Sequence, residues 1–339
     1  MESPSVGTAA WAALPGATGY VGQAVLDALL SWSDVTVVAG VRREGADVPE
    51  GVRVQVVDLC NAAETAATVG ALKPALVVNC AAMSSPRACQ EDPTLCKAVN
   101  CPVSLLDACL RREDPTWRVP ALVHFSTDQV FGGDCPPYFE ADAPAPQNVY
   151  AASKAAFDAL LLKEYPAGRL CILRPTNILG PPSSRGQGGT KFLQWLEGRL
   201  AEALDAAHPT PVPLFCDEFR SYVALADVVA AAQFAAAGLL GRAPPGTHAT
   251  PRLLHVSGPE PLTRVDVARA VLRGLAPGRA AAVERRVLKP TPRASVDTGY
   301  PSPLNLSMPP VLLKRCLGRA PVPIAEAVAA QATPKHAPA

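Results

Sequence analysis

Tyr150 and Lys154 stand four residues apart in a segment with a helical pattern, so their side chains would share one face of a helix. The pKa of a free phenol is about 10, which makes tyrosine a poor acid at neutral pH, and a neighbouring ammonium group lowers that pKa. A phenol tuned in this way can protonate a carbonyl oxygen while a hydride arrives at the carbonyl carbon. The pair predicts hydride-transfer chemistry, although the same spacing also occurs in ordinary surface helices.

Thr127 adds a third polar group to this prediction. It lies in the sequence Ser126-Thr127-Asp128, at the end of an apolar run that predicts a strand. Its hydroxyl group would hydrogen-bond the same carbonyl oxygen as negative charge develops there. Lys154 would also bind the ribose next to a nicotinamide ring. Thr127, Tyr150 and Lys154 are therefore the candidate catalytic residues.

A glycine-rich turn lies near the start of the chain, where residues 15–22 read PGATGYVG between a predicted strand and a predicted helix. Gly16 allows a tight turn, Gly19 lets the backbone approach a pyrophosphate, and Gly22 lets the helix pack closely on the strand. Phosphate oxygens would then meet free N–H groups at the start of the helix. The turn predicts a dinucleotide site, and the alternative is an ordinary strand-to-helix connection.

Basic residues follow the second predicted strand, where Arg42 and Arg43 come directly after Gly40-Val41. An acidic residue here would bind the 2′-hydroxyl group of NAD, whereas basic residues suit the 2′-phosphate of NADP. The pair favours NADP(H), with NAD(H) as the alternative, unless it is only a solvated pair at a loop start. Asp58 follows the third predicted strand, where it would contact the adenine or cap the next helix.

The elements that must position these residues alternate along the chain. Near-continuous apolar runs predict buried parallel strands at 8–14, 35–41, 52–57, 76–80, 121–125, 170–173 and 253–256. Helical patterns occupy 21–30, 62–72, 96–111, 150–165, 191–204, 225–237 and 264–275. This alternation predicts an α/β fold with a doubly wound parallel sheet of the Rossmann type and a smaller C-terminal lobe for the substrate.

The expected domain boundaries follow the same pattern. Residues 8–180 would form the NADP-binding Rossmann domain, with a return segment at about 221–258. Residues 181–220 and 259–330 would form the substrate-binding lobe. The small, polar and proline-broken residues 331–339 would be a disordered tail.

The composition narrows the function classes for this chain of 339 residues. With 31 Lys and Arg against 30 Asp and Glu, the net charge of +1 argues against a nucleic-acid partner. The most membrane-like stretch, 222–241, carries Asp227 and predicts a buried helix, so no membrane partner is expected.

The ten scattered cysteines indicate reduced thiols and a cytoplasmic location. The five histidines show no metal-ligand spacing, so no metal is predicted.

Several stretches carry a family resemblance: residues 77–82 (VVNCAA), 126–133 (STDQVFGG), the Pro-Tyr and Pro-x-Pro pattern before Tyr150, 173–175 (LRP) and 219–221 (FRS). Over about residues 10–325 the chain resembles the extended short-chain dehydrogenase/reductases of the dTDP-4-dehydrorhamnose reductase family. It also resembles the related regulatory β subunit of methionine adenosyltransferase.

The resemblance implies roles for particular residues. It makes Thr127, Tyr150 and Lys154 the catalytic set. Asn100 would support the lysine through water or serve as an amide that packs helices together. Arg220 and Arg293 would contact a nucleotide phosphate or form ion pairs, and Gln129 would lie near the sugar. The cofactor contacts would come from Gly16, Thr18, Gly19, Tyr20, Val21, Gly22, Arg42, Arg43, Asp58, Leu59, Cys80, Ala81, Ala82, Asn100, Tyr150, Lys154, Arg174 and Pro175.

Two function classes follow from this resemblance. The first is an NADPH-dependent reductase of a nucleotide-linked 4-keto-6-deoxy sugar, with Tyr150 as the proton donor. The second is an NADP-binding regulatory subunit that docks on the catalytic subunit of methionine adenosyltransferase. The complete Thr-Tyr-Lys set favours the enzyme, whereas Gln129, in place of the family's tyrosine, leaves the sugar open. A homodimer is a further expected assembly, and a reductase or epimerase of another nucleotide sugar is a third reading.

Overall fold

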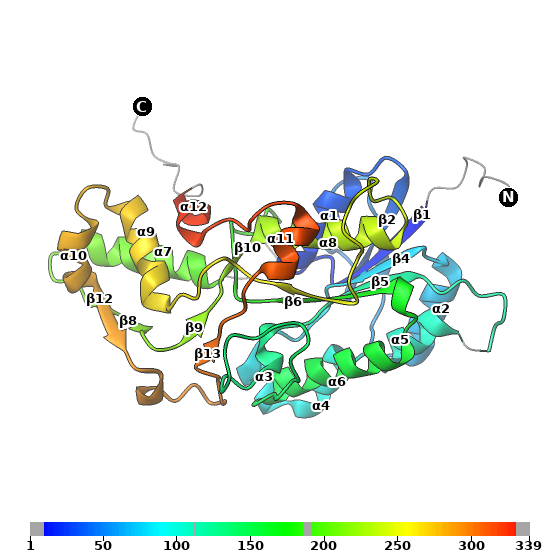
Figure 1. Ribbon diagram of the computed structural model, residues 1–339, viewed down its shortest axis with the longest axis horizontal. Helices are drawn as coiled ribbons and strands as arrows, with labels where there is room; N and C mark the ends of the chain where they lie inside the picture. The colour runs from blue at the N-terminus through cyan, green and yellow to red at the C-terminus, as the bar shows by residue number, and fades with distance from the viewer. Residues whose placement is uncertain (1–9, 112, 186–190, 330–339) are drawn as a thin grey trace.

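The computed structural model describes residues 10–111, 113–185 and 191–329. Its centre is a seven-stranded sheet in which all neighbouring strands are parallel, in the order β11-β6-β5-β4-β1-β2-β3 (Figure 1). The strands are β1 (Ala10–Pro15), β2 (Val35–Val41), β3 (Arg53–Val56), β4 (Leu76–Asn79), β5 (Ala121–Phe125), β6 (Leu170–Pro175) and β11 (Leu253–Val256). The predicted doubly wound Rossmann-type sheet is confirmed.

Helices cover both faces of this sheet (Figure 1). One face carries α1 (Tyr20–Leu30), α8 (Leu225–Leu239) and α11 (Val311–Leu317). The other carries α2 (Ala62–Leu72), α5 (Val103–Leu110) and α6 (Val149–Glu164), with α3 (Pro86–Glu91) and α4 (Pro93–Asn100) against α6. Because all seven strands run in the same direction, their carboxyl ends lie along one edge of the sheet. This is the edge where α/β proteins bind their ligands.

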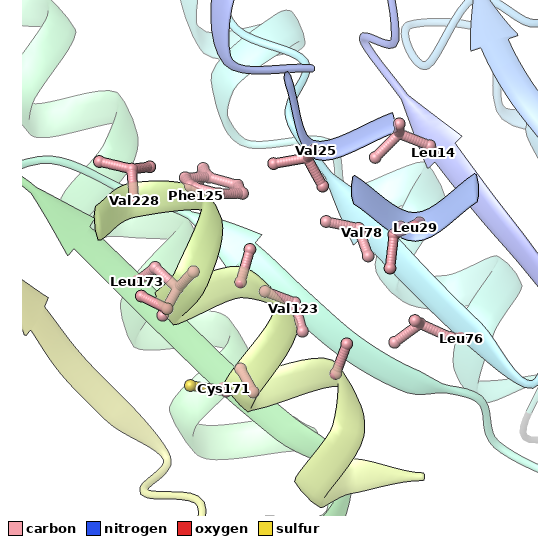
Figure 2. Packing of buried hydrophobic residues seen from close by; sticks show 14 of the residues in the cluster. Leu14, Val25, Leu29, Leu76, Val78, Val123, Phe125, Cys171, Leu173 and Val228 are labelled. Carbon is pink, nitrogen blue, oxygen red and sulfur yellow. The ribbon is translucent and has the colours of Figure 1, made fainter. Parts of the chain in front are cut away.

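The core between the sheet and the α1–α8 layer consists of apolar side chains, most of them aliphatic, from alternate positions of the strands (Figure 2). Leu14 of β1 and Val78 of β4 lie beside Val25 of α1, whereas Val123 of β5 lies against α8. All of these side chains are almost fully buried. The strands are apolar on both faces because a second core lies beneath them against α2, α5 and α6.

The predicted helix at 96–111 is wrong as a single element. The structure divides it into α4 and α5, which are separated by Cys101 and Pro102. Proline has no N–H group and cannot continue the hydrogen-bond ladder of the first helix. Asn148 and Asn61 mark other helix starts, because their side chains accept hydrogen bonds from Ala151 N and Glu64 N.

A smaller set of elements lies at one end of the molecule (Figure 1). Its core joins α7 (Phe192–Asp205), α9 (Arg264–Leu275), α10 (Ala280–Val287) and α12 (Ile324–Ala329) to the paired strands β8 (Val212–Phe215) and β12 (Leu288–Thr291). Short pairs lie between this core and the sheet: β7 (Ile178–Leu179) with β10 (Val223–Ala224), and β9 (Phe219–Arg220) with β13 (Asn305–Leu306). Three single-turn helices complete the described elements: η1 (Asp128–Val130), η2 (Ala167–Arg169) and η3 (Arg293–Ser295).

The domain boundaries stay a prediction, with one difference in the C-terminal part. α11 falls within the range expected for the substrate lobe, yet Leu313 and Cys316 pack into the core beside the sheet. The predicted tail at 331–339 lies outside the described residues. Among the described helices, none has the length and apolar character needed to cross a membrane. The described part of the chain also holds no group of three or more His, Cys, Asp or Glu side chains that could bind a metal ion.

Candidate active site

Two cavities lie along the carboxyl edge of the sheet and share Gly19, Cys80 and Ala82 in their walls. The first has a volume of about 580 Å³ and is lined by the glycine-rich turn and the ends of β2 and β3. The second has a volume of about 570 Å³ and is lined by the ends of β5 and β6 and by the start of α6. Because they share these walls, the two cavities are adjacent parts of one groove.

The glycine-rich turn has the close approach expected of a phosphate-binding loop. Gly16 has a φ of +79°, a conformation that side chains rarely adopt, and its N–H donates to Gly40 O at 3.1 Å. A Cβ atom on Gly16 would lie 2.5 Å from Ala81 N, so no larger residue fits there. Gly19 caps α1 without a side chain, and the first residues of α1 line the second cavity. This backbone can hold the pyrophosphate of a dinucleotide.

The basic pair lies at the far end of the first cavity. Arg42 and Arg43 are exposed and line it together with Asp58 and Leu59. The Asp58 carboxylate accepts a hydrogen bond from Cys60 N at 2.9 Å, whereas Asn61 caps the following helix. The alternative role of Asp58 as the helix cap is therefore wrong, and its carboxylate remains at the cavity wall.

Thr127, Tyr150 and Lys154 line the second cavity together. Thr127 follows β5, and its Oγ1 accepts a hydrogen bond from Gln129 N at 3.2 Å and donates to the Asp128 carboxylate at 3.2 Å. Lys154 is almost fully buried, and its Nζ donates to Phe125 O at 2.6 Å. The three side chains predicted from the sequence therefore come together in the groove.

Burial determines how these groups titrate. It lowers the pKa of Lys154 from 10.5 to about 8, and the Asp158 carboxylate offsets part of that effect. It also raises the pKa of Tyr150 above its usual value of 10, although a hydrogen bond with Thr127 lowers it in part. The prediction that the lysine would leave the phenol with a lowered pKa is wrong for this chain, because desolvation of the buried ring is the largest effect on the pKa and the Asp128 carboxylate acts in the same direction.

Asn100 is an amide that packs helices together, and its support of the lysine through water stays a prediction. Its Oδ1 accepts from Met83 N at 2.8 Å, and its Nδ2 donates to Ser153 Oγ at 3.1 Å and to Cys96 Sγ at 3.3 Å. These contacts join α4, α6 and the loop after β4. Asn100 does not line either cavity of the groove.

Arg174 also lies outside the groove, unlike Pro175, which lines it. Its buried guanidinium forms an ion pair with Asp158 at 3.0 Å and lies over the Phe131 ring at 5.3 Å. The predicted cofactor contact of Arg174 therefore has no support in this geometry. Because Asp158 lies on α6, the ion pair joins β6 to the helix that carries Tyr150 and Lys154.

Arg220 and Arg293 lie in the smaller lobe and do not line the groove. Both approach the buried carboxylate of Glu218, at 3.2 Å and 3.9 Å. The alternative to phosphate contact was an ion pair at the surface. Arg220 does form an ion pair, but its side chain is almost completely buried.

The remaining predicted residues line the groove, as expected from the motifs. The first cavity is lined by Thr18 and Ala81, and the second by Tyr20, Val21, Gly22 and Gln129. Gln129 Oε1 accepts a hydrogen bond from Asn148 Nδ2 at 3.3 Å.

Several groove residues were not predicted from the sequence. Asp128 is fully buried, and burial raises its pKa from 3.8 to about 6. Its place directly after Thr127 was a signal that could have identified it. Asn177, which follows the end of β6, lines the cavity for the same topological reason. Lys191 and Phe192 come from the start of α7 and had no local motif to mark them.

Comparison with known proteins identifies the family. Residues 12–242 match the model of the NAD dependent epimerase/dehydratase family, which is more than half of the chain. The chain belongs to this family.

Curated relatives agree with the resemblance seen in the motifs, which is thereby confirmed. A probable low-salt glycan biosynthesis reductase, Agl14, of Haloferax volcanii is 33% identical over 148 residues, which cover 42% of this chain and 44% of that protein. The dTDP-4-dehydrorhamnose reductase of Mycobacterium tuberculosis is 32% identical over 231 residues, which cover 65% of this chain and 66% of that protein. Methionine adenosyltransferase 2 subunit beta of Mus musculus is 29% identical over 141 residues, which cover 42% of this chain and 39% of that protein. The chain thus spans less than half the length of the first and third of these relatives.

Solved structures share the fold over nearly the whole chain. A UDP-glucose 4-epimerase of Thermus thermophilus in complex with NAD has a TM-score of 0.71 at 23% identity and covers 95% of this chain and 97% of its own. A dTDP-4-dehydrorhamnose reductase of Bacillus anthracis in complex with NADP has a TM-score of 0.66 at 18% identity and covers 94% and 97%. At these identities the comparison concerns the fold alone.

Proposed function

We propose that this protein is an NADP(H)-dependent reductase that acts on the keto group of a nucleotide-linked sugar. The observation that carries this proposal is the groove, in which the glycine-rich turn lies between Arg42 and Arg43 on one side and Thr127, Tyr150 and Lys154 on the other. Membership of the NAD dependent epimerase/dehydratase family supports it.

The first cavity fits a nicotinamide dinucleotide. Gly16, Thr18 and Gly19 would hold the pyrophosphate, and Arg42 and Arg43 would hold the 2′-phosphate of NADP(H) in preference to the bare ribose of NAD(H). When bound, NADPH supplies a hydride to the second cavity. The cofactors named for two structural neighbours, NADP for the B. anthracis reductase and NAD for the T. thermophilus epimerase, agree with this class of cofactor.

The residues of the second cavity would bind and protonate the carbonyl group. Tyr150 would hold a proton at its phenol oxygen and donate it to the substrate oxygen. Because the pKa of the phenol is raised, that proton stays on Tyr150 at neutral pH. Thr127 Oγ1 would hydrogen-bond the same oxygen. Lys154 would fix the position of α6 through its hydrogen bond to Phe125 O and present its ammonium group to the ribose beside the nicotinamide.

We assign the substrate class to nucleotide-linked 4-keto-6-deoxy sugars. The mycobacterial relative, which covers the largest share of this chain among the three compared, is a dTDP-4-dehydrorhamnose reductase. Gln129 lines the second cavity near Thr127, where its amide would hydrogen-bond sugar hydroxyl groups.

The test is an assay of NADPH oxidation with dTDP-4-dehydrorhamnose as the substrate. The loss of NADPH absorbance measures the rate. We expect turnover in the wild type and its loss in Tyr150→Phe. NADPH binding, measured separately by calorimetry, should be the same in both. Wild-type protein that binds NADPH and reduces no nucleotide-linked keto sugar would contradict the proposal.

A second candidate is a regulatory subunit of methionine adenosyltransferase that binds NADP(H) without turnover. The specific observation in its favour is the match to the mouse β subunit. Co-purification with the catalytic subunit of a methionine adenosyltransferase, combined with absence of reductase activity, would favour this candidate over the first.

A further inference from the structure

The Thr127 hydroxyl group has a single hydrogen atom to donate and more than one acceptor within reach. Its Oγ1 accepts a hydrogen bond from Gln129 N at 3.2 Å and donates to the Asp128 carboxylate at 3.2 Å. The Tyr150 phenol also lies within hydrogen-bonding range of this hydroxyl group. Because the hydrogen atom cannot serve the Asp128 carboxylate and a substrate oxygen at the same time, the state of Asp128 decides whether Thr127 can donate to the substrate.

Asp128 lies in the wall of the cavity where the reduction would take place. It is 2% exposed, and its Oδ2 is buried without a hydrogen-bond partner among the described residues. An ionised carboxylate with an unpaired buried oxygen is costly, whereas a protonated carboxyl group carries no net charge. Burial accordingly raises the pKa of Asp128 from 3.8 to about 6, so both protonation states occur close to neutral pH.

Charged groups from other elements also act on Asp128. The Arg220 guanidinium lowers the pKa of Asp128, whereas the Glu218 carboxylate raises it, and burial has the largest effect. Other titratable side chains in the wall of the same cavity are Tyr150, Lys154 and Lys191. The pKa of Lys154 is about 8, well above that of Asp128, so a pH profile can distinguish the two groups.

We propose that Asp128 is a positioning residue for Thr127, and that the protein reduces its substrate in the state in which Asp128 carries a proton. This rests on the function proposed above. In that state the carboxyl O–H donates to Thr127 Oγ1, whose two lone pairs then accept from Asp128 and from Gln129 N. The hydrogen atom of Thr127 is then free for the substrate oxygen, while Tyr150 supplies the proton.

Ionised Asp128 competes with the substrate for the same hydrogen atom. A carboxylate attracts it more strongly than a neutral carbonyl oxygen does, because hydrogen bonds to charged acceptors are the stronger ones. Thr127 then presents only lone pairs to the substrate oxygen, and of the two hydroxyl groups Tyr150 alone donates to it. Loss of the Asp128 proton therefore slows the reduction and does not abolish it.

The pH dependence of kcat/KM for the reduction of dTDP-4-dehydrorhamnose, at saturating NADPH, tests this assignment. We expect the wild-type value to fall between about pH 5.5 and 7.5 to about a tenth or less, the size expected for one donor to a developing oxyanion. Asp128→Asn should remove this decrease, since its amide stays neutral and can donate to Thr127 Oγ1. At the upper end of this pH range the variant should be faster than the wild type by about the same factor of 10.

Thr127→Val separates positioning from a structural effect, because it removes the hydroxyl group through which Asp128 would act. Its kcat/KM should be low and should show no decrease near the pKa of Asp128. Adding Asp128→Asn to Thr127→Val should cause no further change. A structural role of Asp128 would instead give the same change with and without the Thr127 hydroxyl group.

Asp142→Asn is the matched control, because Asp142 accepts a hydrogen bond from Phe139 N at 2.7 Å in an exposed loop and does not line the groove. Its pH profile should equal that of the wild type. A wild-type profile without the decrease would overturn the proposal, as would the same decrease in an Asp128→Asn variant that still binds NADPH.

These outcomes are separate from those of the proposed function. Turnover of a nucleotide-linked keto sugar with the same pH profile in the wild type and in Asp128→Asn would support the reductase and overturn the role of Asp128. NADPH binding without reduction of any such sugar, at both ends of the pH range, would contradict the reductase and the role of Asp128 together.

Discussion

Tyr150 carries the most direct consequence of the proposed chemistry at the residue scale. Tyr150→Phe removes one oxygen atom and keeps the ring that packs beside Cys89 and Cys96. We expect NADPH oxidation with the keto sugar to fall by about 100-fold or more, because a positioned general acid contributes about that factor. The measurement is the turnover number at saturating substrate, together with the NADPH dissociation constant, which should not change.

Tyr165→Phe is the control for this loss. Tyr165 is also buried at the end of α6, but its hydroxyl donates to Pro120 O, away from the groove. Its removal should cost about 1 kcal/mol of stability and leave turnover unchanged. Equal turnover losses in both variants would show that the effect of Tyr150→Phe is structural, and the role of proton donor would then be wrong.

Asp128 gives a pH-dependent prediction at the same scale. Burial raises the pKa of Asp128 from 3.8 to about 6, and the Arg220 guanidinium lowers it in part. The folded chain therefore keeps this proton to a higher pH, so the free energy of unfolding falls as the pH rises from about 4 to 6. Asp128→Asn should remove this decrease and stabilise the protein at neutral pH by up to about 3 kcal/mol, with little effect at pH 4.

Urea unfolding at the two pH values measures this difference. We expect Asp158→Asn to lower the stability where Asp128→Asn raises it, although burial raises the pKa of Asp158 as well. It would leave Arg174 buried without its ion pair and should destabilise the protein at neutral pH. An Asp128→Asn variant with the same stability gain at both pH values would rule out titration of this carboxyl group as the cause.

The sequence identified residues whose neighbours are local or whose place is set by strand ends. Thr127, Tyr150 and the glycines of the turn belong to this class. It misassigned Arg174, because its partner Asp158 lies on a different element and nothing in the local sequence marks the pairing. Glu218 was missed for the same reason, since its partner Arg293 lies in a segment distant in the chain.

At the scale of elements, one contact joins the glycine-rich turn to the loop after β7. Gln23 on α1 donates through Nε2 to Thr18 O at 2.8 Å and to Arg185 O at 3.2 Å. Arg185 in turn pairs with Asp27, one turn further along α1, at 2.7 Å. The loop that enters the smaller lobe is therefore attached to the backbone that would hold the cofactor phosphates.

Gln23→Ala should weaken NADPH binding about 5-fold, because it removes a buried hydrogen bond that fixes the turn. Fluorescence titration with NADPH measures the change. Gln233→Ala is the matched control, since Gln233 on α8 donates to Ala28 O on α1 but lies away from the turn. Equal affinities of the two variants for NADPH would contradict the coupling.

The elements themselves were predictable where the local pattern was strong. The strands at 35–41, 121–125 and 253–256 have the predicted bounds, because each is a near-continuous apolar run whose residues are almost all buried. The two-residue strands β9 and β13 could not be predicted, since so short a segment has no periodicity. Their pairing depends on tertiary contacts such as Phe219 N to Leu304 O.

At the scale of the whole molecule, the C-terminal segment contacts both halves. α11 packs on α8 and β11 beside the sheet, whereas α12 packs on α9 in the smaller lobe. Between these helices the chain is fixed to Asp227, a fully buried residue at the start of α8. Asp227 forms an ion pair with Arg319 at 2.6 Å and accepts a hydrogen bond from Val322 N at 2.7 Å. This carboxylate therefore links the two halves through the segment that follows α11.

Asp227→Asn tests whether that link makes the two halves unfold together. We expect a loss of about 1–3 kcal/mol, because hydrogen bonds to a buried charged group are stronger than neutral ones. We expect the wild type to unfold in a single transition in scanning calorimetry, and we expect that transition to broaden or divide in the variant as the smaller lobe unfolds first. Asp34→Asn removes a comparable ion pair with Arg242, but Asp34 is 69% exposed, so the loss should be at most about 1 kcal/mol without a change in transition shape. If both variants lose the same stability and keep one sharp transition, the C-terminal segment does not couple the halves.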